Sequence, residues 1–321
     1  MLNGIGTILG LVKSEDEKAT LTYSEIRRDL GRSKFSNYLM PRAYSDELKV
    51  FYCEDDTIGF MFECVPVLVF DTQSLKNLEG LFRVAYPEKT VVQIILYADP
   101  DIKDYLDYYE NTKPYAPDVI KQAYKRLREF YEKQTTGNPP IRNFRSFITV
   151  KMPASAREIS PEFLKEVTTQ VEEVLRGCHL SPRLCDVGDY LKLMRQLLNF
   201  RLPENPKAYC TATSIDRQVI LANTEIEVDT TDKCIKITDG DRTRYFRAVT
   251  VKSLPAEIDF FWVNRVTGSY EGMVGDTDQI NTPFMFVLNV VIEDLKAKLH
   301  AKANLALHQQ ALGSFIVSLR R

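Results

Sequence analysis

Two short stretches of alternating apolar and polar residues, separated by a turn, constrain the fold of this chain most strongly. The first runs from Leu48 to Tyr52 and the second from Ile58 to Cys64, with Glu54-Asp55-Asp56-Thr57 between them. A period of two residues on both sides of a short polar turn is typical of a β-hairpin. We therefore predict a hairpin here, with Gly59 serving the turn through a positive φ angle.

The segments after this hairpin predict helices and strands in alternation. Apolar residues recur at helical spacing from Ser74 to Ala85 and stop before Pro87, whereas the apolar run Val91–Leu96 indicates a buried strand. The order of elements at this point is β-β-α-β. Two further helices and one strand are expected next, over Ile102–Glu110, Pro117–Gln134 and Ser146–Met152.

One helix is delimited clearly at both ends. Ser160 is a suitable N-cap, Pro161 occupies the first turn, and Gly177 follows the last apolar position. The second half of the chain then predicts another helix, several strands and a final helix. Their expected ranges are Val187–Phe200 (helix), Gln218–Ala222, Glu225–Val228, Cys234–Thr238, Tyr245–Val251 and the apolar run Phe284–Ile292 (strands), and Asp294–Leu319 (helix).

These patterns predict an α/β (α+β) fold with mixed sheets and packed helices. At 321 residues the chain is long enough for about two domains of roughly 100 to 200 residues. We expect an N-terminal segment over 1–34, α/β subdomains over 35–155 and 156–294, and a terminal helix over 295–321. A weak echo between Phe144-Arg145 and Phe246-Arg247, each followed by Pro-Ala at the same offset, is compatible with duplication and with coincidence.

Composition excludes several classes of protein. The chain has 42 basic and 44 acidic residues, so it has no overall attraction for nucleic acid or anionic lipid. Its apolar runs are far shorter than the roughly 20 residues of a membrane-spanning helix, so we expect a soluble protein. Six scattered cysteines indicate a reducing compartment. The apolar start, Leu2–Val12, lacks a preceding basic residue and a cleavage site, so it is interpreted as a membrane-surface, partner-binding or core-covering segment.

Nucleotide chemistry is not indicated. A phosphate-binding loop needs the string G-x-x-x-x-G-K-[ST], which frees backbone N–H groups and supplies a lysine. The nearest segment, Gly6–Ser14, has its glycines too close together and its lysine displaced. We therefore expect no cofactor in this chain, and neither binding nor hydrolysis of ATP.

Metal and nucleophile sites are also weakly supported. Cys178-His179 with Cys185 is a cluster of three possible ligands without a second pair, and no G-x-S-x-G elbow occurs. The acidic groups around Asp99 and Asp276 are interpreted as turns. We expect neither a metal site nor catalytic residues. The alternative left open is an enzyme with a cryptic site around Asp276 or His179.

Charge is distributed unevenly along the chain. Residues 46–71 contain seven acidic residues and one lysine, whereas residues 295–321 contain no acid. The favoured interpretation of the basic end is a solvated helix whose cations suit the helix dipole. Its five basic residues are the candidate interaction residues: Lys296, Lys298, Lys302, Arg320 and Arg321.

Two segments of the chain resemble TraC-type conjugative-transfer ATPases of the F type. The first comprises Phe35–Tyr44, Val50-Phe51 and Thr57–Pro66, and departs from the family at Leu39–Arg42, where Leu-Pro-Tyr-Arg is usual. The second comprises three pieces, Gln279–Phe284, Val290–Asp294 and Lys302–Leu305. The residues that match the motifs are Phe51, Gly59, Phe60, Glu63, Pro66, Pro283, Phe284, Glu293, Asp294 and Asn304.

The resemblance implies the N-terminal region of a type IV secretion ATPase, because in this family the motor lies further toward the C-terminus. Such a region docks the motor onto inner-membrane subunits for DNA transfer and pilus assembly. It is cytoplasmic, peripherally associated with the bacterial inner membrane, and part of a hexamer in the full-length protein. ATP and Mg are implied only for the motor domain. The alternative is a single-stranded nucleic-acid-binding module that uses the basic terminal helix.

Overall fold

The computed structural model describes residues 35–66, 72–112, 117–135, 141–154, 159–229, 231–250, 280, 282–292 and 314–320. Residues 314–320 are described by their backbone alone. The chain divides into two compact units, Met1–Met40 and Pro41–Arg321. In the first unit the described residues form the 3-10 helix η1, Phe35–Tyr38. The subdomain boundaries expected at residues 155 and 294 stay a prediction.

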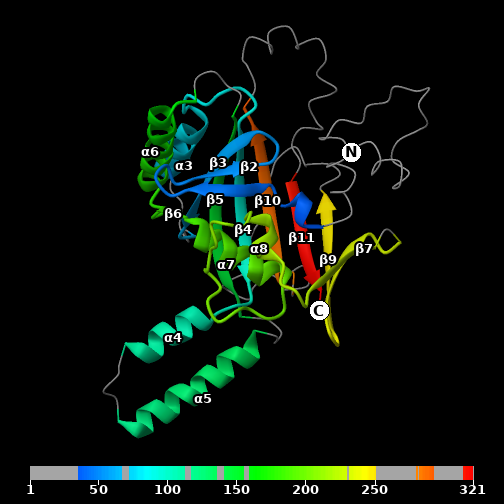
Figure 1. Ribbon diagram of the computed structural model, residues 1–321. Coiled ribbons are helices and arrows are strands. Elements are labelled where there is room, and N and C mark those ends of the chain that lie inside the picture. The colour runs from blue at the N-terminus through cyan, green and yellow to red at the C-terminus, as the bar shows by residue number, and fades with distance from the viewer. Residues whose placement is uncertain are drawn as a thin grey trace, which may run out of the picture. The chain divides into compact units, whose positions relative to one another are not determined.

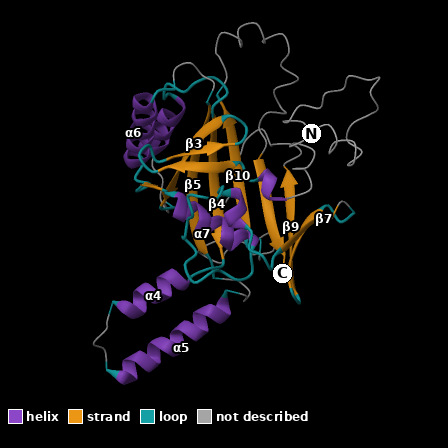
Figure 2. Ribbon diagram, viewed as in Figure 1, coloured by secondary structure: helices purple, strands orange, loops and turns teal. Residues whose placement is uncertain are grey.

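The second unit is built on one sheet of eleven strands in which neighbouring strands are antiparallel (Figures 1 and 2). The order across the sheet is β1-β2-β3-β5-β4-β10-β11-β9-β8-β7, and β6 pairs with β3. The strands are β1 (Pro41–Ser45), β2 (Val50–Cys53), β3 (Thr57–Cys64), β4 (Val91–Asp99), β5 (Asn143–Pro153), β6 (Arg183–Leu184), β7 (Glu225–Asp229), β8 (Cys234–Asp239), β9 (Arg242–Thr250), β10 (Phe284–Val291) and β11 (Ser314–Arg320).

Helices lie between these strands in the sequence. They are α3 (Thr72–Leu78) with the 3-10 turn η2 (Glu79–Phe82), α4 (Lys103–Asn111), α5 (Asp118–Gln134), α6 (Pro161–Gly177), α7 (Val187–Leu198) and α8 (Asp216–Val219). None of the helices in the described part of the chain combines the length and apolarity needed to cross a bilayer.

The main core lies between the sheet and α6. Phe60 and Phe62 of β3 are fully buried and pack with Val171 and Leu175 of α6 in one cluster. Successive strand residues point to opposite faces, so Gly59 and its Cα partner Phe51 face the other side. There the Phe51 ring contacts the ring of Tyr190 on α7, with centroids 5.3 Å apart. Helices α6 and α7 therefore cover opposite faces of the sheet.

Most of the predicted elements are confirmed. The hairpin is β2 and β3, and the β-β-α-β order is present with β1 added before it. Helix α6 begins as expected, because the Ser160 hydroxyl accepts a hydrogen bond from the Phe163 N–H at 3.1 Å and Pro161 follows it. The predicted α+β class is also confirmed.

Two predicted elements are wrong. The strand expected over Gln218–Ala222 is absent: Gln218 and Val219 end the short helix α8, and residues 220–222 form a bend and the start of a turn. Gln218 Nε2 donates to the Cys210 and Thr213 carbonyls at 2.8 and 2.6 Å. The terminal helix is contradicted over Ser314–Arg320, which forms β11 between β10 and β9. Pairing with two neighbouring strands satisfies the backbone on both sides and overrides the helical spacing. The rest of the expected terminal helix, residues 295–313, lies outside the described residues.

Gly59 is required for a different reason from the one predicted. The positive φ angle of the hairpin turn belongs to Asp56, at 53°, and Gly240 is the glycine with positive φ in the described ranges. At Gly59 a Cβ atom would lie 2.7 Å from the carbonyl oxygen of Val150 on β5. Close approach of two backbones therefore explains this glycine.

Candidate functional site

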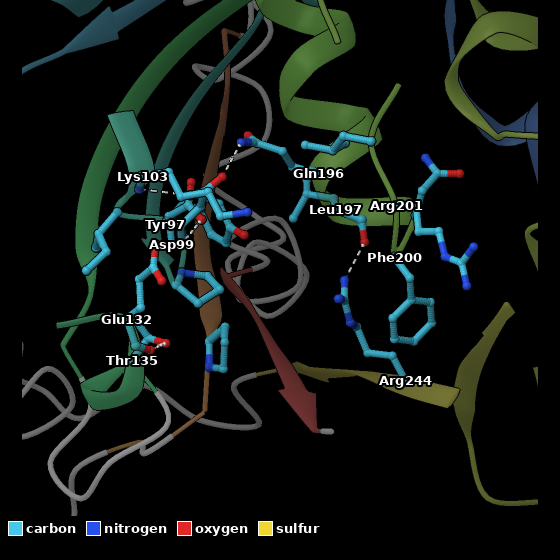
Figure 3. A pocket seen from close by; sticks show the side chains of 16 residues that line it. Tyr97, Asp99, Lys103, Glu132, Thr135, Gln196, Leu197, Phe200, Arg201 and Arg244 are labelled. Atoms are coloured by element: carbon cyan, nitrogen blue, oxygen red, sulfur yellow. Dashed lines mark hydrogen bonds between the residues drawn. The ribbon is translucent and has the colours of Figure 1, made fainter. Parts of the chain in front are cut away.

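Two adjoining hollows lie where the C-terminal end of β4 meets α7. The first has a volume of about 610 Å³ and the second about 450 Å³. Asp99, Asp101 and Gln196 line both, so the hollows form one cleft. Figure 3 shows the first hollow, with Gln196 and Leu197 from α7 across from Tyr97 and Asp99 from β4.

Glu63, near the end of β3, lies at the centre of an ion-pair network beside the second hollow. Arg145 on β5 lies 2.8 Å from one carboxylate oxygen of Glu63, and Arg183 on β6 donates to the other oxygen. Arg145 also lies 3.4 Å from the carboxylate of Asp99 on β4. Because Glu63 and Arg183 are Cα partners in the sheet, strand register fixes this contact. The network joins four strands.

Asp189, in the first turn of α7, extends the network to a helix. Its carboxylate pairs with Arg183 and lies 2.7 Å from the ammonium group of Lys207. Its backbone N–H donates to the Asp186 carboxylate at 2.8 Å, which is one half of a capping box. The first turn of α7 is thus held to β6 and to the loop that carries Lys207.

A pair of acidic residues forms the turn after β4. The Asp101 N–H donates to Asp99 Oδ1 at 2.9 Å, and the Lys103 N–H donates to Asp101 Oδ1 at 3.0 Å. Gln196 Nε2 donates to the second Asp101 oxygen at 3.0 Å, so this turn is tied to α7. Within the described residues, the buried Gln196 Oε1 has no hydrogen-bond partner. The turn predicted from these acidic residues is confirmed, and it also contributes to the cleft.

The far wall of the first hollow is cationic. The Arg244 guanidinium lies over the Phe200 ring at 4.6 Å and donates to the Leu197 carbonyl at 3.5 Å, which is the dashed line beside Arg244 in Figure 3. Arg201 lies 3.5 Å from the carboxylate of Asp239 and is largely exposed. This wall offers positive charge to a partner, whereas the opposite wall offers the acidic turn.

Burial and charge act against each other on the acidic groups of the cleft. Burial disfavours ionisation of Glu63, but the guanidinium groups of Arg145 and Arg183 outweigh it and lower the pKa of the carboxyl. Burial likewise opposes ionisation of Asp189, and hydrogen bonds from Arg183 and Lys207 lower its pKa. For Asp99, burial dominates and raises the pKa. Glu63 and Asp189 are therefore held as carboxylates with paired charges.

Paired charges of this kind can fix the orientation of a bound partner. The carboxylates of Glu63 and Asp189 are paired with the fixed cations of Arg145, Arg183 and Lys207, so they provide shape and paired charge. Among the residues that the structure describes, no three His, Cys, Asp or Glu side chains come together as a metal site. The cysteines are all free. Cys178, considered above as a ligand, is fully buried in the α6 core, with its sulfur 3.5 Å from the Ser74 carbonyl oxygen.

The structure brings some of the motif residues to the cleft and others to the core. Glu63 and Pro66 line the second hollow, and Pro283 lines the first. Phe60 is a core residue, and the fully buried Phe284 ring lies under the Arg142 guanidinium at 5.6 Å. Phe51 and Gly59 belong to the face covered by α7, as described above.

The remaining predicted residues cannot be placed relative to the cleft. Arg320 lies on β11, where its Cα partner is Tyr245. The others lie outside the described residues: Glu293, Asp294, Lys296, Lys298, Lys302, Asn304 and Arg321.

Sequence reasoning missed most of the cleft. Arg145 was noted in the Phe144-Arg145 echo, but nothing in its spacing points to Glu63, from which it is separated by 82 positions. Arg183 and Asp189 carried no motif. The available signal was local: Asp186 and Asp189 have the spacing of an acidic capping box before an apolar helix.

Comparison with known proteins identifies the family. A family model described as "TraC protein" matches residues 35–321. The chain belongs to the TraC family. Protein TraC of Escherichia coli strain K12 is 19% identical to it over 316 residues, which cover 94% of this chain and 35% of that protein. The chain thus spans about a third of the length of this TraC relative. Membership of the TraC family supports a role in conjugation-related type IV secretion.

Proposed function

We propose that this chain is the N-terminal docking and assembly region of a TraC-type ATPase of conjugative type IV secretion. In this role it links the motor to the inner-membrane subunits of the secretion complex during DNA transfer and pilus assembly. The observation that carries the proposal is the convergence of the two family-like segments. Glu63 and Pro66 from one segment and Pro283 from the other line the same cleft, although more than 200 positions separate them.

Two further observations support a docking role. The cleft presents paired charges on a rigid sheet, which is the kind of surface that fixes the orientation of a protein partner. The sequence contains no phosphate-binding string, so we assign ATP and Mg to a separate motor domain of the longer protein. We place the region in the cytoplasm, at the inner membrane, as such a link requires.

Single-stranded nucleic-acid binding has less support. That alternative needs a continuous basic helix over 295–321. Arg320 instead lies in strand β11, between two other strands of the sheet. Binding of single-stranded DNA with an affinity that falls steeply as the salt concentration rises would support the nucleic-acid-binding alternative.

A competition experiment in conjugating cells tests the docking role. Overproduction of this chain beside the complete secretion machine of its own host should lower transfer frequency, because the chain occupies docking positions without supplying a motor. It should also co-purify with inner-membrane subunits after detergent extraction.

Two matched pairs of charge-reversal substitutions test whether the cleft causes the inhibition of transfer and the co-purification. Lys103→Glu with Arg201→Glu changes two exposed residues of the cleft, and Lys165→Glu with Arg176→Glu changes two exposed residues of α6. The cleft pair should relieve the inhibition and reduce co-purification, whereas the α6 pair should do neither. Equal behaviour of the two pairs would refute the cleft as the docking site, and an absence of both inhibition and co-purification would refute the proposed function.

A further inference from the structure

The ion pairs of the cleft differ in how far each partner is exposed to solvent. The Asp189 side chain is 9% exposed, whereas its partners Arg183 and Lys207 are 53% and 52% exposed. In the first hollow, the Asp239 side chain is 9% exposed and its partner Arg201 is 70% exposed. In each of these pairs the acid lies beneath the cation. The surface that the pairs present to solvent is therefore cationic.

The acidic turn after β4 has the same character. Asp99 is buried. The two carboxylate oxygens of Asp101 accept hydrogen bonds from the Lys103 N–H and from Gln196. The Lys103 side chain, by contrast, is exposed. Lys103 and Arg201 lie on opposite sides of the first hollow in Figure 3. A ligand placed between them would therefore meet positive charge from two directions.

The first hollow also has an apolar part. Its volume of about 610 Å³ lies within the range of sites that bind small molecules or side chains. The apolar residues that line it include Pro100, Leu197, Leu202 and Pro283. Leu202 directly follows the exposed Arg201 in the sequence. The hollow thus suits a ligand that combines an apolar side chain with neighbouring negative charge.

We infer that the cleft binds an acidic segment of a protein partner, in which an apolar side chain lies between carboxylates. The inference rests on the proposed docking function and gives the chemistry of the partner at that site. The exposed cations are distributed over both hollows, so an extended segment with several carboxylates contacts more of them than one small anion does. Hydrogen bonds between a carboxylate and a guanidinium or ammonium group are stronger than those between neutral groups.

Two features of the cleft favour a peptide over a nucleic acid. Asp104, which is largely exposed, lines the second hollow, and the exposed Glu132 lines the first. These carboxylates repel a phosphate backbone that is charged at every position, whereas a peptide can place neutral residues beside them. The Arg244 guanidinium already lies over the Phe200 ring at 4.6 Å. That ring face therefore does not serve as a platform for a stacked base.

Fluorescence anisotropy with the complete 321-residue chain tests the preference for acidic segments. The probe is a short labelled peptide of alternating Glu and Asp with one central Phe. It should bind with a micromolar dissociation constant that rises with salt concentration. A peptide with Lys at every acidic position, a peptide with Ser in place of Phe, and an oligothymidylate of similar length should each bind at least about tenfold more weakly. No binding of the acidic peptide, or tighter binding of any of the three controls, would overturn the inference.

Substitutions of opposite sign test whether the peptide occupies the cleft. Lys103→Glu with Arg201→Glu should raise the dissociation constant of the acidic peptide at least about tenfold. Asp104→Asn with Glu132→Gln should lower it, because two repulsive charges are removed. The α6 pair, Lys165→Glu with Arg176→Glu, should leave it unchanged. Equal effects of the cleft and α6 pairs, or weaker binding after neutralisation of the two acids, would contradict binding in the cleft.

The outcomes separate this inference from the docking function itself. A chain that inhibits transfer and co-purifies with inner-membrane subunits, but does not bind the acidic peptide, would retain the docking function and refute the acidic partner. A chain that binds the acidic peptide through the cleft, but neither inhibits transfer nor co-purifies, would retain the preference for acidic segments and refute the docking function.

Discussion

Replacement of Gly59 by alanine tests how tightly β3 and β5 approach at the centre of the sheet. The new Cβ atom would lie 2.7 Å from the Val150 carbonyl oxygen and 3.5 Å from the Lys151 Cα atom. Both are backbone atoms of a strand that is paired on both sides, so no side-chain rotation relieves the contact. The strands must separate by a few tenths of an ångström, and the hydrogen bonds between them lengthen.

The expected cost follows from two opposing terms. Overpacking of a well-packed interior costs about 1–3 kcal/mol. The loss of backbone freedom in the unfolded chain returns about 0.4–1 kcal/mol when glycine becomes alanine. The free energy of unfolding of Gly59→Ala should therefore fall by about 1–2 kcal/mol, and that of Gly59→Val by more, because its two extra methyl groups enter the same space.

Urea unfolding followed by far-ultraviolet circular dichroism measures this change. Gly80→Ala is the matched control, because its Cβ would meet the Val174 methyl groups at 3.4 and 3.7 Å. Those methyl groups can move, so the control should stay within about 0.5 kcal/mol of the parent chain. A Gly59→Ala chain as stable as the parent would refute the close-approach argument.

Three other predictions concern the cleft, a buried amide and nucleotide binding. Glu63→Gln should destabilise the chain at pH 7 and cost progressively less in urea titrations below about pH 4.3, because the lowered pKa of Glu63 gives stability that is lost as pH falls through the folded-state value. Asn199→Ala should cost about 2–4 kcal/mol in the same assay, because the buried Asn199 side chain bonds the Val219 carbonyl at 2.9 Å and the Leu221 N–H at 2.9 Å, and both lose a partner. Isothermal titration calorimetry should detect no saturable ATP binding at micromolar concentration. A saturable isotherm would contradict the expectation, drawn from the missing phosphate-binding string, that this chain does not bind ATP.

Local sequence signals predicted the elements whose ends are fixed by local chemistry. Helix α6 depends on Ser160, Pro161 and a run of apolar residues one turn apart, all of which are visible in the sequence. Strand β11 depends instead on pairing with β10 and β9, and the nearest residues of β9 lie more than 60 positions away. No local pattern encodes such pairing, so the helical spacing in that stretch was misleading.

The cleft was less predictable than the fold for the same reason. The turn at Asp99 and Asp101 follows from short-range hydrogen bonding, and it was predicted. The contact of Arg145 with Glu63 and Asp99 depends on the register of β3, β5 and β4, where one residue of slip would move Arg145 to the other face of the sheet. A single sequence contains no record of that register.

The cleft and the helices α4 and α5 differ in how a substitution in each must be interpreted. In the cleft, the ion pairs of Glu63, Arg145 and Asp189 join strands to a helix. Removal of one charged side chain leaves its partner unpaired in a partly buried position. Such a substitution therefore lowers the stability of the chain as well as any docking. Helices α4 and α5 have no buried residue among those that the structure describes. Substitutions such as Val119→Asp should therefore leave the unfolding transition of the sheet in place, which urea unfolding would check. A loss of docking caused by a substitution in the cleft must therefore be compared with the loss of stability in the same variant, whereas a substitution on the exposed face of α5 needs no such correction.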